Sequence, residues 1–236
     1  MGLTLLGCSK DKDPGAIIVN LTHMVDNEEL VLESRQYPAL SGHTYSVHRL
    51  KYYISNLRLV KEDGTFFDPA VVHYCDISEE ETNRFQLDNV PAGTYRGISF
   101  TYGLDESLNV DDGLPRTQTN INMEWPIPGD QGYHYMKFEG KYDSLGTGVI
   151  KNFNLHTGAT MGNQNYIDFN FDIPAISIDG NQWSIDLVMD LNEWLQNPHT
   201  WDFATYGPMI MMKQDAQEVL KANGKTVFTV ASVVKD

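Results

Sequence analysis

Short runs of alternating apolar and polar residues recur along most of the chain, separated by Gly, Pro, Asn and Asp. In the first run, Ile17, Val19 and Leu21 share one face with His23, because side chains alternate along an extended strand. The same pattern predicts strands at residues 45–60, 71–77, 84–90, 96–104, 131–142, 149–156, 166–173, 176–178, 182–190 and 226–234. The chain is therefore predicted to be all-β, an antiparallel β-sandwich.

Three segments depart from this pattern. Within residues 45–60 the apolar phase changes twice, which predicts β-bulges. Asp105 to Gly129 has no period and forms a loop of about 25 residues, where four to six is usual, so this loop is expected to be functional or mobile. Residues 211–222 predict one short C-terminal helix, ended by Asn223 and Gly224. No repeat or internal boundary divides residues 16–236, which are expected to form a single domain.

The beginning of the chain has a different character. Leu5-Leu6-Gly7-Cys8 looks like the lipobox of a bacterial lipoprotein, in which the cysteine carries lipid after cleavage. Few residues precede Cys8, so residues 1–15 are interpreted as the end of a truncated signal followed by a polar tether. This predicts a periplasmic or cell-surface protein that is anchored to the bacterial outer membrane by lipid.

Composition and charge narrow the classes of partner. The chain has 32 acidic and 17 basic residues and a net charge of -15, so it repels phosphate backbones and nucleic acid is not an expected partner. No segment approaches the roughly 20 apolar residues of a membrane-spanning helix, so the lipid anchor is the only expected membrane contact. The two cysteines, Cys8 and Cys75, are too few for a disulfide framework.

Catalytic motifs are missing from the sequence. There is no Gly-x-Ser-x-Gly elbow, no His-Glu-x-x-His zinc motif and no Gly-Lys-Ser/Thr phosphate loop. Paired carboxylates such as Asp111-Asp112 occur in local acidic runs typical of a solvated surface. We therefore do not expect the protein to be an enzyme.

Two kinds of metal chemistry are compatible with the remaining residues. The acidic loop at residues 105–113 carries oxygen ligands that suit calcium, although it lacks the spacing of an EF-hand; the alternative is that its side chains bond their own backbone. Seven histidines and nine methionines offer ligands for copper or zinc. Each histidine also has a structural interpretation: His23 and His134 lie in phase with apolar neighbours, and His156 lies at a strand end. Met123 and Trp125 close the long loop and also suit packing.

Taken together, several segments resemble the MbnP-like family of bacterial periplasmic and cell-surface copper-binding proteins, which in some members are associated with methanobactin operons. The most specific elements are Tyr52-Tyr53-Ile54-Ser55-Asn56-Leu57 and Lys137-Phe138-Glu139-Gly140. The other matching segments, in chain order, are residues 45–59, 90–95, 99–105, 109, 123–125, 132–140 and 154–158. They cover most of the chain.

This resemblance implies a β-sandwich that holds one copper ion through histidines and a tryptophan-derived ligand. It implies that Trp125, in Met-x-Trp, is the modified residue, oxidised to kynurenine by a partner dihaem protein related to cytochrome c peroxidases. It further implies that His156, in His-x-Gly, and His23, in the first strand, are ligands, with Met123 as a soft neighbour.

The sequence therefore predicts a lipid-anchored protein that stores, buffers or delivers copper. The alternative is a surface binding or adhesion module that keeps the same sandwich without copper, with calcium or a protein partner at the acidic loop. The copper hypothesis expects His23 and His156 to converge near Trp125.

Overall fold

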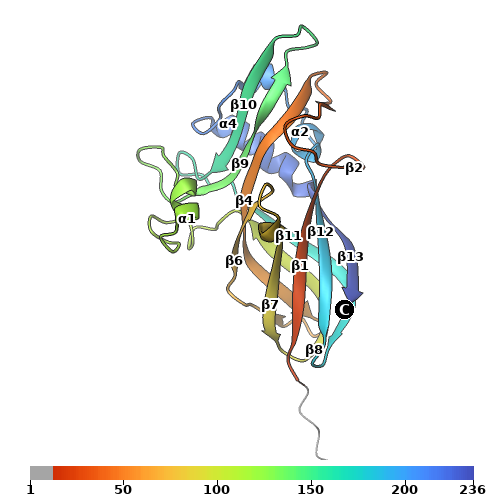
Figure 1. The fold of residues 1–236 in the computed structure, drawn as a ribbon. Helices are drawn as coiled ribbons and strands as arrows, with labels where there is room; N and C mark the ends of the chain where they lie inside the picture. The colour runs from red at the N-terminus through yellow and green to blue at the C-terminus, as the bar shows by residue number, and fades with distance from the viewer. Residues whose placement is uncertain (1–12) are drawn as a thin grey trace, which may run out of the picture.

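The computed structural model describes residues 13–236, and two β-sheets form its framework (Figure 1). The smaller sheet contains β1 (Gly15–Val25), β2 (Glu28–Glu29), β7 (Arg84–Val90), β12 (Gln182–Asp190) and β13 (Phe228–Lys235). The larger sheet contains β3 (Tyr37–Pro38), β4 (Thr44–Lys61), β5 (Phe66–Phe67), β6 (Val72–Asp76), β8 (Gly93–Tyr102), β9 (His134–Asp143), β10 (Ile150–Gly158) and β11 (Ile167–Ile178). The predicted all-β sandwich is confirmed.

Alternation of side chains explains how the two sheets pack. Ile17, Val19 and Leu21 of β1 and Ile185 and Leu187 of β12 are all buried and belong to the core between the sheets. Burial of such aliphatic side chains contributes about 1.5–3 kcal/mol each, which makes this core the main source of stability. One pair departs from the antiparallel prediction, because β1 runs parallel to β12 along its length.

The long strand β4 is bulged, as its changing apolar phase predicts. Its register shifts between Val47 and Arg49 against β9, and between Ser55 and Arg58 against β8. A bulge adds a residue to one strand and bends it, so the 18 residues of β4 pair with β9 in the first half (44–52) and with β8 in the second (54–61).

Helices are few and short. The 3-10 turns are η1 (Glu80–Asn83) and η2 (Gly224–Thr226); the α-helices are α1 (Gln118–Met123), α2 (Glu193–Gln196), α3 (Phe203–Tyr206) and α4 (Gln214–Asn223). Helix α4 is the predicted C-terminal helix and begins three residues later than expected. Helix α1 was not predicted: it lies inside the long loop, which protrudes beside β9 and β10 (Figure 1).

Two predictions concern the membrane: a lipid anchor at Cys8 and the absence of a membrane-spanning helix. The lipobox ending at Cys8 lies outside the described residues. Across residues 13–236, no helix is long and apolar enough to cross a bilayer.

Candidate metal centre

The long loop returns to the larger sheet through a small hairpin that carries Trp125. Helix α1 begins where the Thr117 hydroxyl accepts a hydrogen bond from the Asn120 backbone N–H (3.2 Å), and it ends at Met123. The backbone N–H of Trp125 then donates to the carbonyl of Gly132 (2.8 Å). This short pairing places Trp125 next to the first residue of β9, which is His134.

Three aromatic rings meet at this point. The centroids of Trp125 and His134 are 4.8 Å apart, and those of His134 and His156 are 5.0 Å apart. Trp125 and His134 are only 7% and 3% exposed. His156 reaches the cluster from β10, which pairs with β9, so two adjacent strands and one hairpin supply the three side chains.

Gly158 allows the tryptophan to pack against β10. A Cβ atom at this position would lie 2.6 Å from two ring carbons of Trp125, closer than real Cβ contacts occur. The register of β10 against β9 shifts between Thr157 and Gly158, which lets the strand end bend around the ring. The Gly in the His-x-Gly motif is therefore explained by close approach of Trp125.

Hydrogen bonds fix the orientation of both imidazoles. His134 Nδ1 donates to the carbonyl oxygen of Met123 (3.0 Å), because a carbonyl oxygen can only accept. The lone pair of the neutral His134 ring is therefore on Nε2. His156 Nε2 lies 2.8 Å from Glu139 Oε1, to which it donates. In a neutral ring the lone pair of His156 is then on Nδ1, and this atom is buried with no hydrogen-bond partner.

The electrostatics favour an ionised Glu139 carboxylate and a neutral His134 imidazole. Burial acts to raise the pKa of Glu139, but bonds from His156 and from Arg49 (2.7 Å) outweigh it and lower this pKa to about 2. Burial, together with the nearby Lys137 ammonium, lowers the pKa of His134 to about 3. His134 is therefore neutral at physiological pH, the protonation state that metal ligation requires.

One side of the tryptophan borders a cavity of about 320 Å³. Trp125, Glu124 and Tyr133 line it together with Asp111, Asp112, Arg116 and Gly132. The indole nitrogen of Trp125, like His156 Nδ1, is buried without a hydrogen-bond partner. The cluster is thus buried but lies next to a cavity formed by the long loop.

The structure does not place His23 with these rings. His23 Nε2 lies 2.9 Å from the Tyr52 hydroxyl and 4.0 Å from Cys75 Sγ, in the core between the two sheets. His156, in contrast, alternates with the buried core residues Phe153 and Leu155 and so faces away from that core. The larger sheet separates the two histidines, and the expected convergence of His23 with Trp125 does not occur.

Met123 is close in sequence but contributes its backbone. Its carbonyl oxygen holds His134, whereas its side chain is 1% exposed and packs in a second apolar cluster with Tyr53, Leu104 and Tyr133. The predicted role of Met123 as a soft neighbour is therefore replaced by a positioning role for its carbonyl.

His23 gives a testable pH dependence of stability. Burial lowers its pKa from 6.5 to about 4, so the folded protein resists a proton that the unfolded chain binds. The contribution of His23 to the free energy of unfolding therefore keeps its full value above pH 6.5. It decreases as pH falls toward 4, by an amount on the order of 3 kcal/mol. We expect His23→Gln to flatten this part of the curve of unfolding free energy against pH, measured by urea denaturation between pH 7 and 4. An unchanged slope would contradict the assignment.

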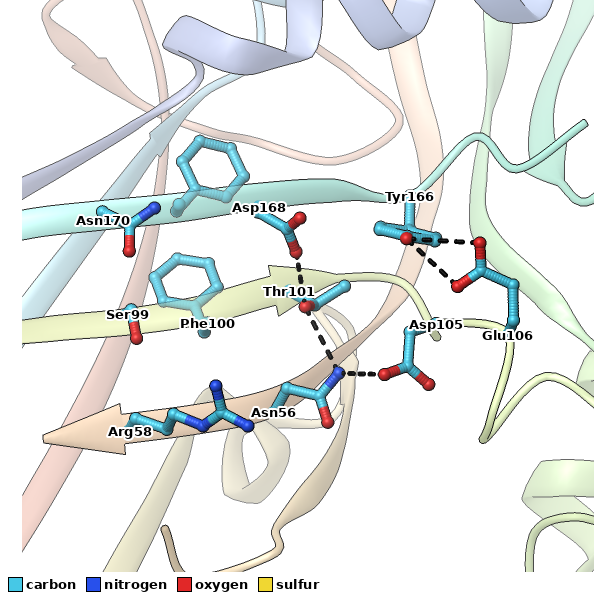
Figure 2. A pocket seen from close by; sticks show the side chains of 11 residues that line it. Asn56, Arg58, Ser99, Phe100, Thr101, Asp105, Glu106, Tyr166, Asp168 and Asn170 are labelled. Carbon is cyan, nitrogen blue, oxygen red and sulfur yellow. Dashed lines mark hydrogen bonds between the residues drawn. The ribbon is translucent and has the colours of Figure 1, made fainter. Parts of the chain in front are cut away.

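Carboxylates of the acidic loop hydrogen-bond to its own backbone, which was the alternative to calcium binding. Asp105 Oδ1 accepts from the backbone of Ser107 (3.0 Å) and Leu108 (3.1 Å), and Asp105 Oδ2 accepts from Asn56 (2.8 Å). Figure 2 shows Asp105 and Asn56 along a polar cavity of about 380 Å³, where the Tyr166 hydroxyl donates a hydrogen bond to Glu106. The carboxylates of Asp105 and Glu106 thus accept hydrogen bonds from the loop and its neighbours, and their geometry does not support a calcium site.

Histidines, cysteines and carboxylates alone do not complete a metal site. Across residues 13–236, no three such side chains are grouped so that they could hold a metal ion. His134 and His156 supply two nitrogen donors, and Trp125 is the third side chain at the same place. The cluster fits a metal only if the tryptophan becomes a donor, because an indole N–H can only donate a hydrogen bond.

Alternation with apolar neighbours indicated only that His134 is a buried strand residue. The family resemblance implied His23 as the ligand instead. A signal was present, since His134 lies in the matching segment 132–140, a short hairpin away from Trp125. Burial of alternating residues fits a ligand and a structural histidine equally well, so only the ring contacts distinguish them.

Comparison with known proteins gives a consistent result. The MbnP family model matches residues 14–213. The structure is similar to that of MbnP from Methylosinus trichosporium, with a TM-score of 0.55 and 16% identity over 93% of this chain and 98% of that chain, which supports the fold. No curated protein sequence matches. Because the family model covers most of the chain, the protein belongs to the MbnP family.

Proposed function

We propose that the protein binds copper outside the cytoplasm, anchored by lipid at Cys8, and stores, buffers or delivers the ion rather than catalysing turnover. His134 and His156 are the proposed imidazole ligands, and Trp125, once oxidised, is the third. Imidazole suits both oxidation states of copper. The name of the solved relative and the family match support the general assignment.

The observation that carries the proposal is the unpaired Nδ1 of His156. A buried polar atom without a partner costs about 1–3 kcal/mol, and Glu139 orients the ring so that this atom is left free. His134 is held in the opposite tautomer beside it by Met123. Two oriented imidazoles with their lone pairs free are what a metal ligand set requires.

Trp125 supplies a third donor only after modification. Cleavage of the C2–C3 bond of its pyrrole ring with peroxide as the oxidant, followed by hydrolytic release of C2 as formate, would leave kynurenine. The indole nitrogen would then be an aromatic amine and C3 a carbonyl group. The nitrogen concerned is buried and unpaired, and the ring borders the cavity of about 320 Å³. We propose that a dihaem partner related to cytochrome c peroxidases carries out this oxidation.

Glu139 is expected to tune the site through His156. Carboxylates that orient a ligating histidine typically contribute 10–100-fold to metal affinity, so Glu139→Gln is expected to weaken copper binding by about this factor. Competition with a chelator of known affinity measures the change. Glu62→Gln, which removes a surface pair with Arg96 (2.9 Å), is the matched control and should leave copper affinity unchanged. Equal effects of the two substitutions would contradict the proposed role.

Metal analysis and peptide mass spectrometry on protein isolated from its native membrane test the whole proposal. Stoichiometric copper together with an oxidised Trp125 peptide is the expected result. Copper on unmodified Trp125 would keep the binding role and remove the maturation partner. Absence of copper affinity would overturn the proposal and favour a surface binding module with the same sandwich.

A further inference from the structure

Among residues 13–236, three methionine side chains are unusually exposed. Met161 and Met212 are each 71% exposed and Met209 is 59% exposed, whereas core methionines such as Met136 and Met189 are fully buried. Methionine normally fills gaps in cores, whereas exposed methionines are typical of binding surfaces.

A strand pairing places Met209 on the same face as His156. Met209 forms a parallel bridge with Asn154, whose N–H donates to the carbonyl of Pro208 (2.8 Å). Paired residues in a sheet point to the same face, and Asn154 shares its face with His156, two residues further along β10. Met209 is therefore a diagonal neighbour of His156 on that face.

Further contacts bring the other methionines to the same end of β10. The Thr160 hydroxyl donates to the carbonyl of Met211 (2.7 Å), so the turn carrying Met161 lies beside the segment carrying Met212. The Met161 N–H donates to Asp130 (3.1 Å), in the hairpin that carries Trp125.

One buried side chain connects this segment to the candidate ligand directly. Gln217 of α4 donates to the carbonyls of His156 (2.8 Å) and Ile210 (3.2 Å), and Ile210 is flanked by Met209 and Met211. The segment with the exposed methionines is therefore held against the strand end that carries His156.

We propose that Met161, Met209 and Met212 form an exchange surface at which cuprous ions enter and leave the site at His134, His156 and Trp125. This inference rests on the proposed copper-binding function. Thioethers favour the reduced, soft ion, and thioether ligands on exposed, flexible side chains bind weakly enough to release it. The methionines thus provide transient contacts at the surface beside a site that is itself largely buried.

The first test compares transfer rate with affinity. A triple variant, Met161→Leu, Met209→Leu and Met212→Leu, conserves volume and removes the thioethers. We expect its equilibrium cuprous affinity to match that of the wild type, while transfer to bathocuproine disulfonate slows about tenfold. Met24→Leu on β1 of the smaller sheet is the control, with no change expected. Transfer at the wild-type rate by a triple variant that binds copper normally would overturn the inference.

The second test separates this inference from the proposed function. Protein labelled with carbon-13 on the methionine methyl groups is titrated anaerobically with cuprous ion beyond one equivalent and followed by NMR. We expect shifts at Met161, Met209 and Met212 and none at Met136 or Met189. Shifts at the exposed methionines without a tight site would contradict the proposed function alone, whereas no shift at these residues would overturn the exchange surface.

Discussion

His134→Ala is expected to lower copper affinity by roughly a hundredfold or more, because it removes one of two oriented imidazoles. Structural zinc sites with four ligands bind with about 10–16 kcal/mol, and by the same scale each ligand contributes about 3 kcal/mol. His156→Ala should have a similar effect. The apo protein should lose only about 1–3 kcal/mol of stability, from the unpaired groups that each substitution leaves behind. Chelator competition and urea unfolding measure the two quantities separately.

The matched control is His23→Gln. The resemblance to the family implied that His23 is a ligand, whereas the structure places it against Tyr52 in the core. His23→Gln should therefore keep full copper stoichiometry while changing the pH dependence of stability. Loss of copper in His23→Gln with retention in His134→Ala would reverse our assignment. A His156→Ala protein that unfolds and shows no separate copper phenotype would indicate a structural histidine instead.

Gly158→Ala is expected to damage the site without touching a ligand. The added Cβ would lie 2.6 Å from the Trp125 ring, which has to move away from β10 and from the histidines. Overpacking of this kind typically costs about 1–3 kcal/mol of stability. Displacement of the ring should also lower copper affinity by about 10–100-fold, the range found when groups that position ligands are lost.

Gly97→Ala on β8 provides the comparison for that variant. Its Cβ would lie 3.2 Å from the Val60 Cβ and 3.3 Å from the Phe171 carbonyl oxygen, which are tight contacts but much less severe than 2.6 Å. Gly97 also lies on a strand that carries none of the three rings. A small stability change and unaltered copper binding are expected. Should Gly158→Ala bind copper like the wild type, the packing of Trp125 on β10 would have no role in the site.

Local patterns predicted the strands well for a physical reason. Alternation of side chains is a property of the strand itself, so Trp183, Ile185, Leu187 and Met189 indicate β12 without knowledge of its neighbours. The changing phase in β4 predicted bulges by the same reasoning. Helix α1 was missed because it has only six residues, too few to show a helical period inside a polar loop.

Alternation, loop length and motifs in the sequence were sufficient to predict the all-β fold, the long loop, the family resemblance and the proximity of His156 to Trp125. Two features became visible only in the folded protein: β1 runs parallel to β12, and His134, rather than His23, meets Trp125. Both buried histidines alternate with apolar residues, so local pattern treats them alike. Which imidazole faces the tryptophan depends on strand register, on the bend at Gly158 and on the path of a long loop, and these are set by contacts between residues far apart in the chain.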